Sequence, residues 1–539
     1  MKKLFLTLVM VVLSMGLIFV GAQKTPAATA PAKPTSTPTP KPKTQSPTKT
    51  TTPTPTPRYG GVLKILYSRE HTTIGYPPVI SASTGIFCGR PALEPLLDFD
   101  SIGHFQPTYL ATGWKMAPDG KSATITLRKG VKFHDGTDFN ADAVKWNLDK
   151  EIENKMSGTE IWKSIDLIDN YTVRMNLTQY DCVLPQSLSL TIGTMVSPTA
   201  YAKNGQDWMV THPVGTGPFK LKSFVQDVSV KYEKFTDYYK KGLPYLDGVE
   251  LDFMTDPMVQ QAALRAGAGQ VAYTTIPQYA RDLKELGFNV ASRMDTIIWI
   301  SGDSRNADSP MANQKVREAL EYAIDREAIA KLFYGYARAA YQWAIPEFPL
   351  GYIPGLSRRE YNPAKAKKLL AEAGYPNGFK TRIIFDMNQK LMEPMTAVQS
   401  YWKAIGVDCT LEQAPRAQYV QLRSQGWHNG FIEVTTALFP SNYLALMAQV
   451  FSPGYTGTRS IQRPAGWGEA ISQTRAARTL EAIKAGMQGL TRKLYEEATV
   501  IPLYQWAEPT PMDKSVHDSG IQELSSSYMW TPEKCWLSK

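Results

Sequence analysis

The chain has 539 residues, and its 59 Lys and Arg against 49 Asp and Glu give a formal net charge of +10. Eight of the positive charges and no acidic residue lie in residues 1–58, so residues 59–539 contain 51 basic and 49 acidic side chains. This nearly neutral remainder argues against a globally basic nucleic-acid binder, and 43% hydrophobic residues argue against a disordered chain. The length predicts about three domains.

The N-terminus has the pattern of an export signal. Met1-Lys2-Lys3 precedes the uncharged run from Leu4 to Val20, and the small residues Gly21-Ala22 follow. This order predicts a secretory signal over residues 1–22 that is cleaved after Ala22. Because about 20 apolar residues span a bilayer, an uncleaved membrane anchor is the alternative. Position 23 is Gln rather than Cys, which excludes lipid attachment at that residue.

Residues 23–58 have the composition of a linker. They contain ten prolines and twelve threonines, with few apolar side chains to bury. Because proline fixes φ and removes a backbone donor, we expect an extended, semi-rigid spacer. At about 3.1 Å per residue this spacer could reach on the order of 100 Å. A passive disordered leader is the alternative.

The rest of the chain alternates between strand-like and helix-like segments. The strand-like segments are 60–67, 123–128, 228–232, 249–253, 297–300 and 382–385, and the helix-like segments are 143–151, 258–266, 315–330, 363–373, 393–404 and 476–498. Asn362, Pro363 and Gly374 supply an N-cap, a first-turn proline and a stop for the helix over 363–373. The interleaving predicts an α/β fold with mixed sheets.

Motifs of catalysis and cofactor binding are missing from the sequence. It contains no H-E-x-x-H, G-x-S-x-G or Walker A pattern, and its one G-x-G-x-x-A, from Gly267 to Ala272, follows a helix-like segment and is interpreted as a helix stop. His134-Asp135 is interpreted as a hydrogen-bonded turn. We therefore predict no enzyme and no cofactor.

Metal-binding and disulfide patterns are equally weak. The six histidines are never within five residues of one another, and the four cysteines (Cys88, Cys182, Cys409 and Cys535) form no C-x-x-C pair. No metal site is predicted, although one built from distant loops stays open. The cysteines fit either one or two long-range disulfides or buried thiols.

Five stretches together resemble a known family. They are Leu127 to Thr137 (LRKGVKFHDGT), Gly215 to Phe219 (GTGPF), Val316 to Leu320 with Ala323 to Arg326, Tyr361 to Tyr375, and Trp402 to Val407. In this order they resemble landmarks of the extracytoplasmic solute-binding proteins of ABC importers, in the family 5 class of oligopeptide-, dipeptide- and nickel-binding proteins. The resemblance runs from about Tyr59 to the C-terminus.

The resemblance implies a two-lobe fold of the periplasmic-binding-protein type with mixed sheets and a hinge. Lobe I would comprise residues 59–93, 214–297 and 498–539, with an extra domain inserted over 94–213, and lobe II would comprise 298–497. Such a protein is exported to the periplasm or cell envelope, acts as a monomer, closes on a peptide-like or oligosaccharide ligand, and delivers it to the transmembrane subunits of an ABC permease.

Two other functions stay open on the same residues. A ligand sensor or adhesion module could use this scaffold and present its closed form to a signalling partner. An exported hydrolase could use scattered carboxylates or His134.

The expected ligand site departs from the peptide binders of the family. Those proteins place an acidic side chain, in an Asp-Tyr-Pro-Asp-Pro-like stretch, against the ligand's amine, whereas the stretch from Glu433 to Tyr443 has no Asp, and Glu433 could substitute only with a shifted register. The candidate ligand-binding residues are Arg423, Trp427, Phe431, Phe439, Asn442, Tyr443, Tyr504 and Trp506, with Tyr341 and Trp343 as further candidates. Aromatic and amide groups suit a neutral or amphipathic ligand, and the alternative is that these aromatic residues belong to the core.

Overall fold

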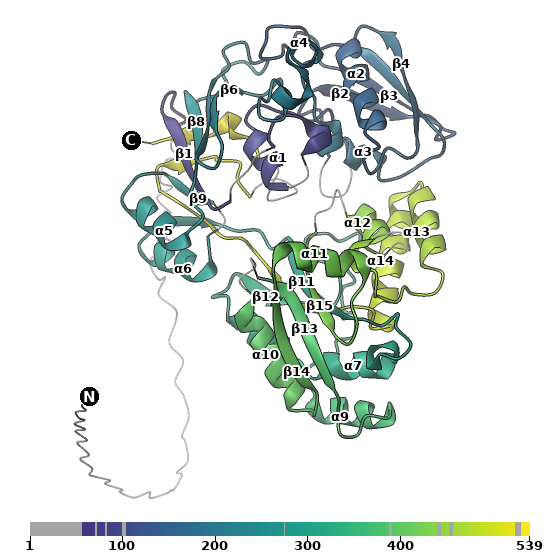
Figure 1. Ribbon diagram of the computed structural model, residues 1–539. Helices are drawn as coiled ribbons and strands as arrows, with labels where there is room; N and C mark the ends of the chain where they lie inside the picture. The colour runs from purple at the N-terminus through teal and green to yellow at the C-terminus, as the bar shows by residue number, and fades with distance from the viewer. Residues whose placement is uncertain are drawn as a thin grey trace, which may run out of the picture. The chain divides into compact units, whose positions relative to one another are not determined.

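The computed structural model describes residues 56–69, 73–80, 83–99, 104–273, 275–387, 391–438, 443–451, 456–522 and 530–538 (Figure 1). The predicted export signal over 1–22 and the linker over 23–58, apart from its last three residues, lie outside these ranges. Within the described ranges, no helix has the length and apolar character that crossing a membrane requires.

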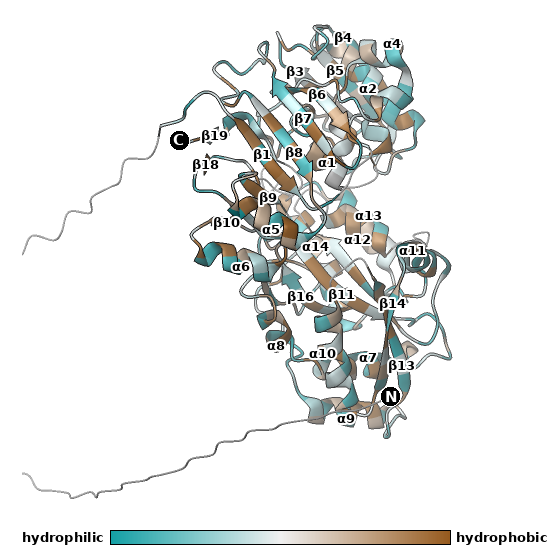
Figure 2. Cartoon of the chain, turned by 60° about the vertical axis from the view of Figure 1, so that its left-hand side comes forward, coloured by the Kyte–Doolittle hydropathy of each residue, from teal (hydrophilic) through white to brown (hydrophobic). Residues whose placement is uncertain are grey.

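A seven-stranded sheet gathers strands from three separate parts of the chain. Its order is β10 (Asn289–Ala291), β17 (Thr510–Met512), β9 (Val271–Tyr273), β1 (Val62–Tyr67), β8 (Gly248–Phe253), β7 (Ser229–Lys234) and β6 (Phe219–Val225). The central strand β1 is parallel to both β8 and β9. Leu66 packs toward α5 (Pro257–Arg265) and α6 (Pro277–Glu285), whereas Ile65 and Tyr67 pack toward α1 (Ser83–Gly89). Helices on both faces explain the hydrophobic residues of β1 and β9 in Figure 2.

A separate four-stranded sheet has its own hydrophobic core. It is antiparallel, in the order β2 (Ala111–Met116), β3 (Ser122–Leu127), β5 (Thr172–Leu177) and β4 (Trp162–Asp169). The helix predicted over 143–151 is α2 (Ala141–Glu153), which packs against this sheet. Asn140 caps α2 by accepting a hydrogen bond from the Ala143 amide at 3.0 Å.

The third large sheet has six strands. Its order is β12 (Ala337–Ala339), β16 (Ile501–Trp506), β11 (Thr296–Gly302), β15 (Phe431–Ala437), β13 (Lys380–Asp386) and β14 (Asp408–Ala414). All of β11 is buried, because Ile298 and Ile300 belong to the core on one face and Ile297 and Trp299 to the core on the other.

The helices of these two cores match the predicted segments only in part, since no helix is predicted from the sequence over 416–425, 443–450 or 467–475. They are α7 (Gln314–Tyr322), α8 (Arg326–Lys331), α9 (Pro363–Glu372), α10 (Met392–Lys403), α11 (Arg416–Gln425), α12 (Tyr443–Val450), α13 (Trp467–Ala476) and α14 (Leu480–Glu496). The helix over 363–373 is confirmed as α9, with Asn362 as its cap. The single helix predicted over 315–330 is wrong, because Asp325 breaks it by capping α8. The segment 476–498 starts later than predicted, at Leu480, where Thr479 is the cap.

One strand differs from the expected division of the chain. Residues 498–539 were expected in lobe I, but β16 pairs with β11 and β12 of the six-stranded sheet, and the chain reaches β17 of the seven-stranded sheet only after residues 507–509. A buried strand carries no local signal of the sheet that it joins. We therefore propose that lobe II extends to Trp506.

Two of the five signature stretches meet in the structure. The amide of His134 donates to the Gly215 carbonyl at 2.9 Å, and His134 Nε2 lies 2.9 Å from the Gly217 carbonyl oxygen. Burial lowers the pKa of the His134 imidazole to about 4, so the ring is neutral at pH 7. Gly215 passes so close to Ala92 that a Cβ on Gly215 would lie 2.2 Å from the Ala92 carbonyl oxygen. The GTGPF stretch, which leads into β6 of the seven-stranded sheet, is therefore hydrogen-bonded to the loop that follows β3 of the four-stranded sheet.

We expect Gly215→Ala to lower the free energy of unfolding by about 2 to 3 kcal/mol, because the backbone oxygen of Ala92 cannot move away from the new methyl group without displacing the turn to which it belongs. Urea unfolding followed by far-UV circular dichroism measures this. Gly489→Ala is the matched control, since Gly489 lies in α14 with open space around it and the helix should gain up to about 1 kcal/mol. Equal effects of the two substitutions would contradict the close approach at Gly215.

Candidate functional site

Two short segments join the seven-stranded and six-stranded sheets. Residues 292–295 connect β10 to β11, and residues 507–509 connect β16 to β17. Because an extended chain covers at most about 3.5 Å per residue, the sheet edges that they join lie within about 18 Å of each other. The two sheets are drawn one above the other in Figure 1, with these crossings between them.

Both crossings attach at the edges where the parallel strands end. β13 is parallel to β14 and β15, and β11 is antiparallel to β15 and β16, so β13, β14, β15 and β16 all end at the edge where β11 begins. In the other sheet, β1, β8 and β9 end at the edge where β17 begins. In α/β sheets ligands bind outside the carboxyl ends of the strands. These two facing edges are the candidate site.

Several loops of this site are outside the described residues. Residues 70–72, 274, 388–390 and 439–442 follow β1, β9, β13 and β15, respectively. Two of the predicted ligand residues, Phe439 and Asn442, fall in the last of these gaps and stay predictions.

Buried polar side chains lie along β15 and β16 on one face of the six-stranded sheet. Thr435 and Tyr504 both pair with Ile298, from opposite sides, and Glu433 pairs with the next residue on that face, Ile300. The Thr435 hydroxyl donates to Glu433 Oε1 at 2.7 Å. Among the described residues, Glu433 Oε2, the Tyr504 hydroxyl and the Trp506 indole N–H have no hydrogen-bond partner although all three atoms are buried. Buried polar atoms of this kind need water or a ligand.

Burial raises the pKa of the Glu433 carboxyl to about 7. Its pKa in the unfolded chain is about 4.3, so the folded protein keeps a proton that the unfolded chain loses as the pH rises. The contribution of Glu433 to the free energy of unfolding therefore falls by about 3 kcal/mol as the pH rises from about 4.5 to 7. Glu433→Gln should remove this decline.

Thermal and urea unfolding of the parent protein and of Glu433→Gln between pH 5 and pH 8 measure how their free energies of unfolding differ. We expect the variant to gain stability relative to the parent as the pH rises. Parallel pH profiles would show that Glu433 is not the titrating group.

The edge of the seven-stranded sheet rests on an aromatic stack. The rings of Tyr67, Phe87 and Tyr273 are stacked, with centroids 4.0 Å apart for Phe87 and Tyr273, and Trp530 continues the stack at 4.8 Å from Phe87. All four side chains are fully buried, so they support the edge rather than offer a ligand surface. Arg69, just after β1, forms an ion pair with Glu508 of the crossing 507–509.

The protein has two halves: one contains the seven-stranded and four-stranded sheets, and the other contains the six-stranded sheet. A third connection between these halves is noncovalent. Arg475, at the end of α13, donates from Nε to Asp181 Oδ2 at 2.7 Å, and the Cys182 amide donates to the Arg475 carbonyl at 2.9 Å. Asp181 is only 1% exposed. Arg478 donates to the carbonyls of Pro118 and Asp119 at 2.7 and 3.0 Å. We call residues 118–119 and 180–183 together with 474–478 the latch; it joins the four-stranded domain to helices of the six-stranded sheet.

Three predicted ligand residues are core residues in the structure. Trp427 is buried, with its indole N–H donating to the Gly430 carbonyl at 3.0 Å. Phe431 packs against Trp402 with ring centroids 4.6 Å apart. Tyr443 is buried and donates to the Trp343 carbonyl at 2.8 Å. All three have protein partners, so the alternative that these aromatic residues belong to the core fits them better than the ligand role does.

The remaining predicted residues that the structure describes lie in α11 and β16. Arg423 is partly buried and donates to the Gly457 carbonyl at 2.8 Å. Tyr504 and Trp506 lie in the last three residues of strand β16, next to the crossing 507–509, and pack against Phe333. Among the predicted residues that the structure describes, Tyr504 and Trp506 combine a place at the carboxyl edge with an unpaired polar atom.

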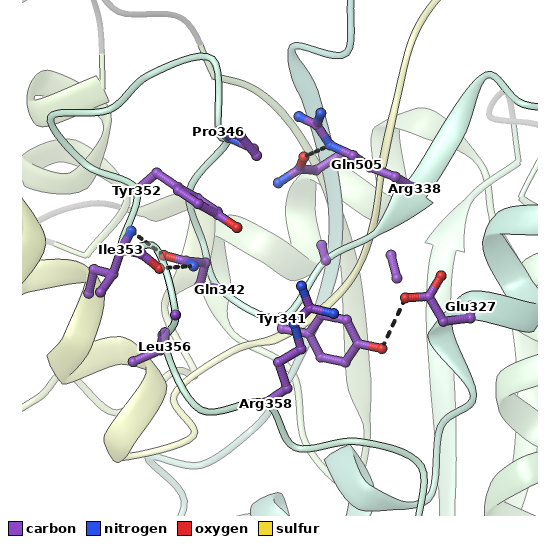
Figure 3. Close-up of a pocket in the computed structure, with 13 residues that line it drawn as sticks. Glu327, Arg338, Tyr341, Gln342, Pro346, Tyr352, Ile353, Leu356, Arg358 and Gln505 are labelled. Atoms are coloured by element: carbon purple, nitrogen blue, oxygen red, sulfur yellow. Dashed lines mark hydrogen bonds between the residues drawn. The ribbon is translucent and has the colours of Figure 1, made fainter. Parts of the chain in front are cut away.

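A pocket of about 320 Å³ lies beside the edge strand β12 (Figure 3). Tyr341 lines this pocket, whereas the neighbouring candidate Trp343 is buried in the core. Sequence reasoning missed the other members, of which the polar ones are Glu327, Arg338, Gln342, Tyr352, Arg358 and Gln505. They come from α8, β12, β16 and the loop between β12 and α9, and no periodic pattern shows that these segments are neighbours.

Neither metal ligands nor reactive thiols gather at the site. Within the described residues, no three His, Cys, Asp or Glu side chains come together in a way that could hold a metal ion. All four cysteines are buried, and burial raises the pKa of the Cys182 and Cys409 thiols to about 12.

A family model and curated relatives both match this sequence. The family model for bacterial extracellular solute-binding proteins, family 5, middle part, matches residues 107–456. The glutathione-binding protein GsiB of Salmonella choleraesuis is 36% identical over 352 residues, which cover 61% of this chain and 68% of that protein.

Solved structures share the fold. DppA of Helicobacter pylori, an ABC transporter-associated periplasmic binding protein solved with the peptide STSA, superposes with a TM-score of 0.76 at 23% identity, over 89% of this chain and 99% of its own. NikA of Brucella suis, solved with Fe(III)-EDTA, gives a TM-score of 0.79 at 22% identity, over 88% of this chain and all of its own.

Proposed function

The chain belongs to the bacterial extracellular solute-binding proteins of family 5, which capture ligands for ABC importers, and we propose that its ligand is a short peptide-like solute. The ligand would lie between the carboxyl edges of the seven-stranded and six-stranded sheets. The observation that supports this most is a set of unpaired buried atoms: those of Tyr504 and Trp506 at the carboxyl edge of β16, and Glu433 Oε2 further from that edge in β15.

The chemistry of these atoms suits a peptide-like molecule. A carboxylate accepts from an ammonium or amide N–H, while a tyrosine hydroxyl and an indole N–H donate to carbonyl or carboxylate oxygens. The similarity to a glutathione-binding protein favours glutathione or another peptide of two to four residues as the first solute to test. An oligosaccharide offers hydroxyl groups but no cation for Glu433.

The latch supplies the closing step of the proposed mechanism. Hinge motion at 292–295 and 507–509 would separate residues 118–119 and 180–183 from residues 474–478, so the latch contacts belong to the closed state. A ligand that touches both edges gains all its contacts only in that state and shifts the equilibrium toward it.

The protein acts outside the cytoplasm, as members of this family do, and its relatives are solute-binding proteins rather than enzymes. We further propose that residues 1–22 direct export or anchor the chain. Residues 23–58 would space the folded body from the envelope, and a monomer would present the closed form to the transmembrane subunits of an ABC permease.

Isothermal titration calorimetry with a defined panel tests the proposed ligand class. The panel contains glutathione, trialanine, the dipeptide Met-Leu, cellotriose and Ni²⁺. We expect one-to-one binding of at least one peptide, and weaker binding of it by Tyr504→Phe. Binding of cellotriose or Ni²⁺ with no response to any peptide would overturn the peptide assignment.

A further inference from the structure

The pocket beside β12 belongs to one half of the protein only. Its lining residues all come from the segment between Glu327 and Arg358 and from Gln505 of β16, so its walls do not depend on closure of the two halves. Its volume of about 320 Å³ is at the lower end of the range for small-molecule sites. A solute of amino-acid size would fill it.

Two arginines, Arg326 and Arg358, lie over the Tyr341 ring, and a third, Arg338, lines the same pocket. Arg326 is fully buried and paired with Glu321 at 3.2 Å. Arg338, on β12, donates to Glu347 Oε1 at 2.8 Å and to Gln505 Oε1 at 2.5 Å. Arg358 lies over the Tyr341 ring with its guanidinium carbon 5.0 Å from the centroid, and it has no acidic partner among the described residues. Of the arginines beside Tyr341, Arg358 is the one available to an anion.

A carboxylate lies beside the hydroxyl of the same ring. The Tyr341 hydroxyl donates to Glu327 Oε1 at 3.4 Å, and Glu327 has no cationic partner among the described residues. In Figure 3, Arg358 lies against the ring of Tyr341 and Glu327 lies beside its hydroxyl, so one aromatic side chain separates the two charges. The pocket therefore presents a cation and an anion, neither of them neutralised, on either side of one rigid ring.

The other walls are mostly apolar. Ala339, Ala340, Pro346, Ile353 and Leu356 line the pocket, and the hydroxyl of Tyr352 makes no hydrogen bond within the described residues. Gln342 and Gln505 are engaged by the protein itself, Gln342 with the backbone of Ile353 and Gln505 with the Ala344 carbonyl. The polar groups that remain for a solute are thus Glu327, Arg358 and Tyr352.

We propose that this pocket is a second binding site, which takes a zwitterionic solute of amino-acid size. Its carboxylate binds the Arg358 guanidinium and its ammonium binds Glu327, as charge-assisted hydrogen bonds, while an aliphatic side chain packs against the apolar walls. This site is independent of the peptide site proposed between the sheet edges.

Calorimetry with three matched probes tests this site. L-Leucine has both charges, 4-methylpentanoate keeps only the carboxylate and 3-methylbutan-1-amine keeps only the ammonium. We expect L-leucine to bind one-to-one and each truncated probe to bind at least tenfold more weakly. Arg358→Ala and Glu327→Gln should each weaken L-leucine binding at least tenfold, whereas Glu360→Gln, an exposed acid on the same loop, should leave it unchanged.

The peptide titration separates this proposal from the proposed function. Arg358→Ala should keep the response to whichever peptide the parent protein binds, because Arg358 does not line the sheet edges. The proposal is overturned if L-leucine does not bind, if the Arg358 and Glu327 variants bind it like the parent, or if the Glu360 control loses binding equally.

Discussion

Glu321→Ala is expected to lower the free energy of unfolding by about 3 to 5 kcal/mol. Glu321, on α7, is 2% exposed and is bound by two buried arginines: Arg326 at 3.2 Å and Arg359 at 3.0 Å. Removing the carboxylate leaves the buried Arg326 guanidinium without a counter-charge among the described residues, and it leaves Arg359 paired with Glu318 at 3.6 Å. Such a loss costs far more than the intact pair contributes, because a buried charge without a partner has neither water nor an ion to stabilise it.

The same two arginines tie distant segments together. Arg326 Nε donates to the Pro502 carbonyl of β16 at 2.6 Å, and Arg359 donates to the Tyr495 carbonyl of α14 at 2.6 Å. A displaced Arg326 would therefore also disturb β16, which leads into the crossing 507–509. We expect ligand affinity to fall together with stability.

Chemical unfolding of Glu321→Ala measures the loss, and two further variants control it. Glu321→Gln keeps the size and one acceptor oxygen, so it should lose less than the alanine variant. Glu372→Ala removes an ion pair to Lys315 of 2.9 Å whose side chains are 39% and 52% exposed, and it should cost no more than about 1 kcal/mol. A loss below 1 kcal/mol for Glu321→Ala would show that the buried cluster does not depend on its carboxylate.

Arg475→Ala is expected to weaken ligand binding roughly 30- to 100-fold with little change in the association rate. In the closed state the variant would bury Asp181, which is 1% exposed, without its cation. In the open state Asp181 would be solvated, so the substitution raises the free energy of the closed state alone. The complex should then dissociate faster.

Stopped-flow fluorescence with glutathione, or with the peptide of the panel that binds, measures both rate constants. Arg492→Ala removes the same charge from an exposed pair within α14 and should change the affinity less than twofold. The double variant Asp181→Ala with Arg475→Ala should recover most of the lost affinity, since it removes the unpaired carboxylate. Equal losses in the double variant and the single variant would show that the latch acts through something other than this ion pair.

Local sequence patterns predicted the elements but not their partners. Asn362 and Pro363 identified α9, and the alternation after Gly60-Gly61 identified β1, because caps and burial periodicity are encoded within a few residues. The same signals could not show that β16 joins the six-stranded sheet. That depends on pairing with β11, about 200 residues earlier, and any buried strand would show the same hydrophobic run.

The candidate site was predicted only in part, because the sequence does not show which distant residues become neighbours in the folded chain. Tyr504 and Trp506 lie at the carboxyl edge, but Trp427, Phe431 and Tyr443 fill the core, and an aromatic residue looks alike in sequence in either place. Asp181 and Arg475 are 294 residues apart, so only the folded chain shows that they meet. Arg358 and Glu327 likewise become neighbours of one ring only through the path of a long loop.

The central claim is that a peptide ligand closes the two halves of the protein over the facing sheet edges. Spin labels at Lys121→Cys and Lys484→Cys, two exposed positions on either side of the latch, would report this motion by double electron–electron resonance, since all four natural cysteines are buried. We predict that glutathione, or the peptide shown by calorimetry to bind, shortens and narrows the distance distribution. An unchanged distribution under conditions where calorimetry shows the site saturated would contradict it.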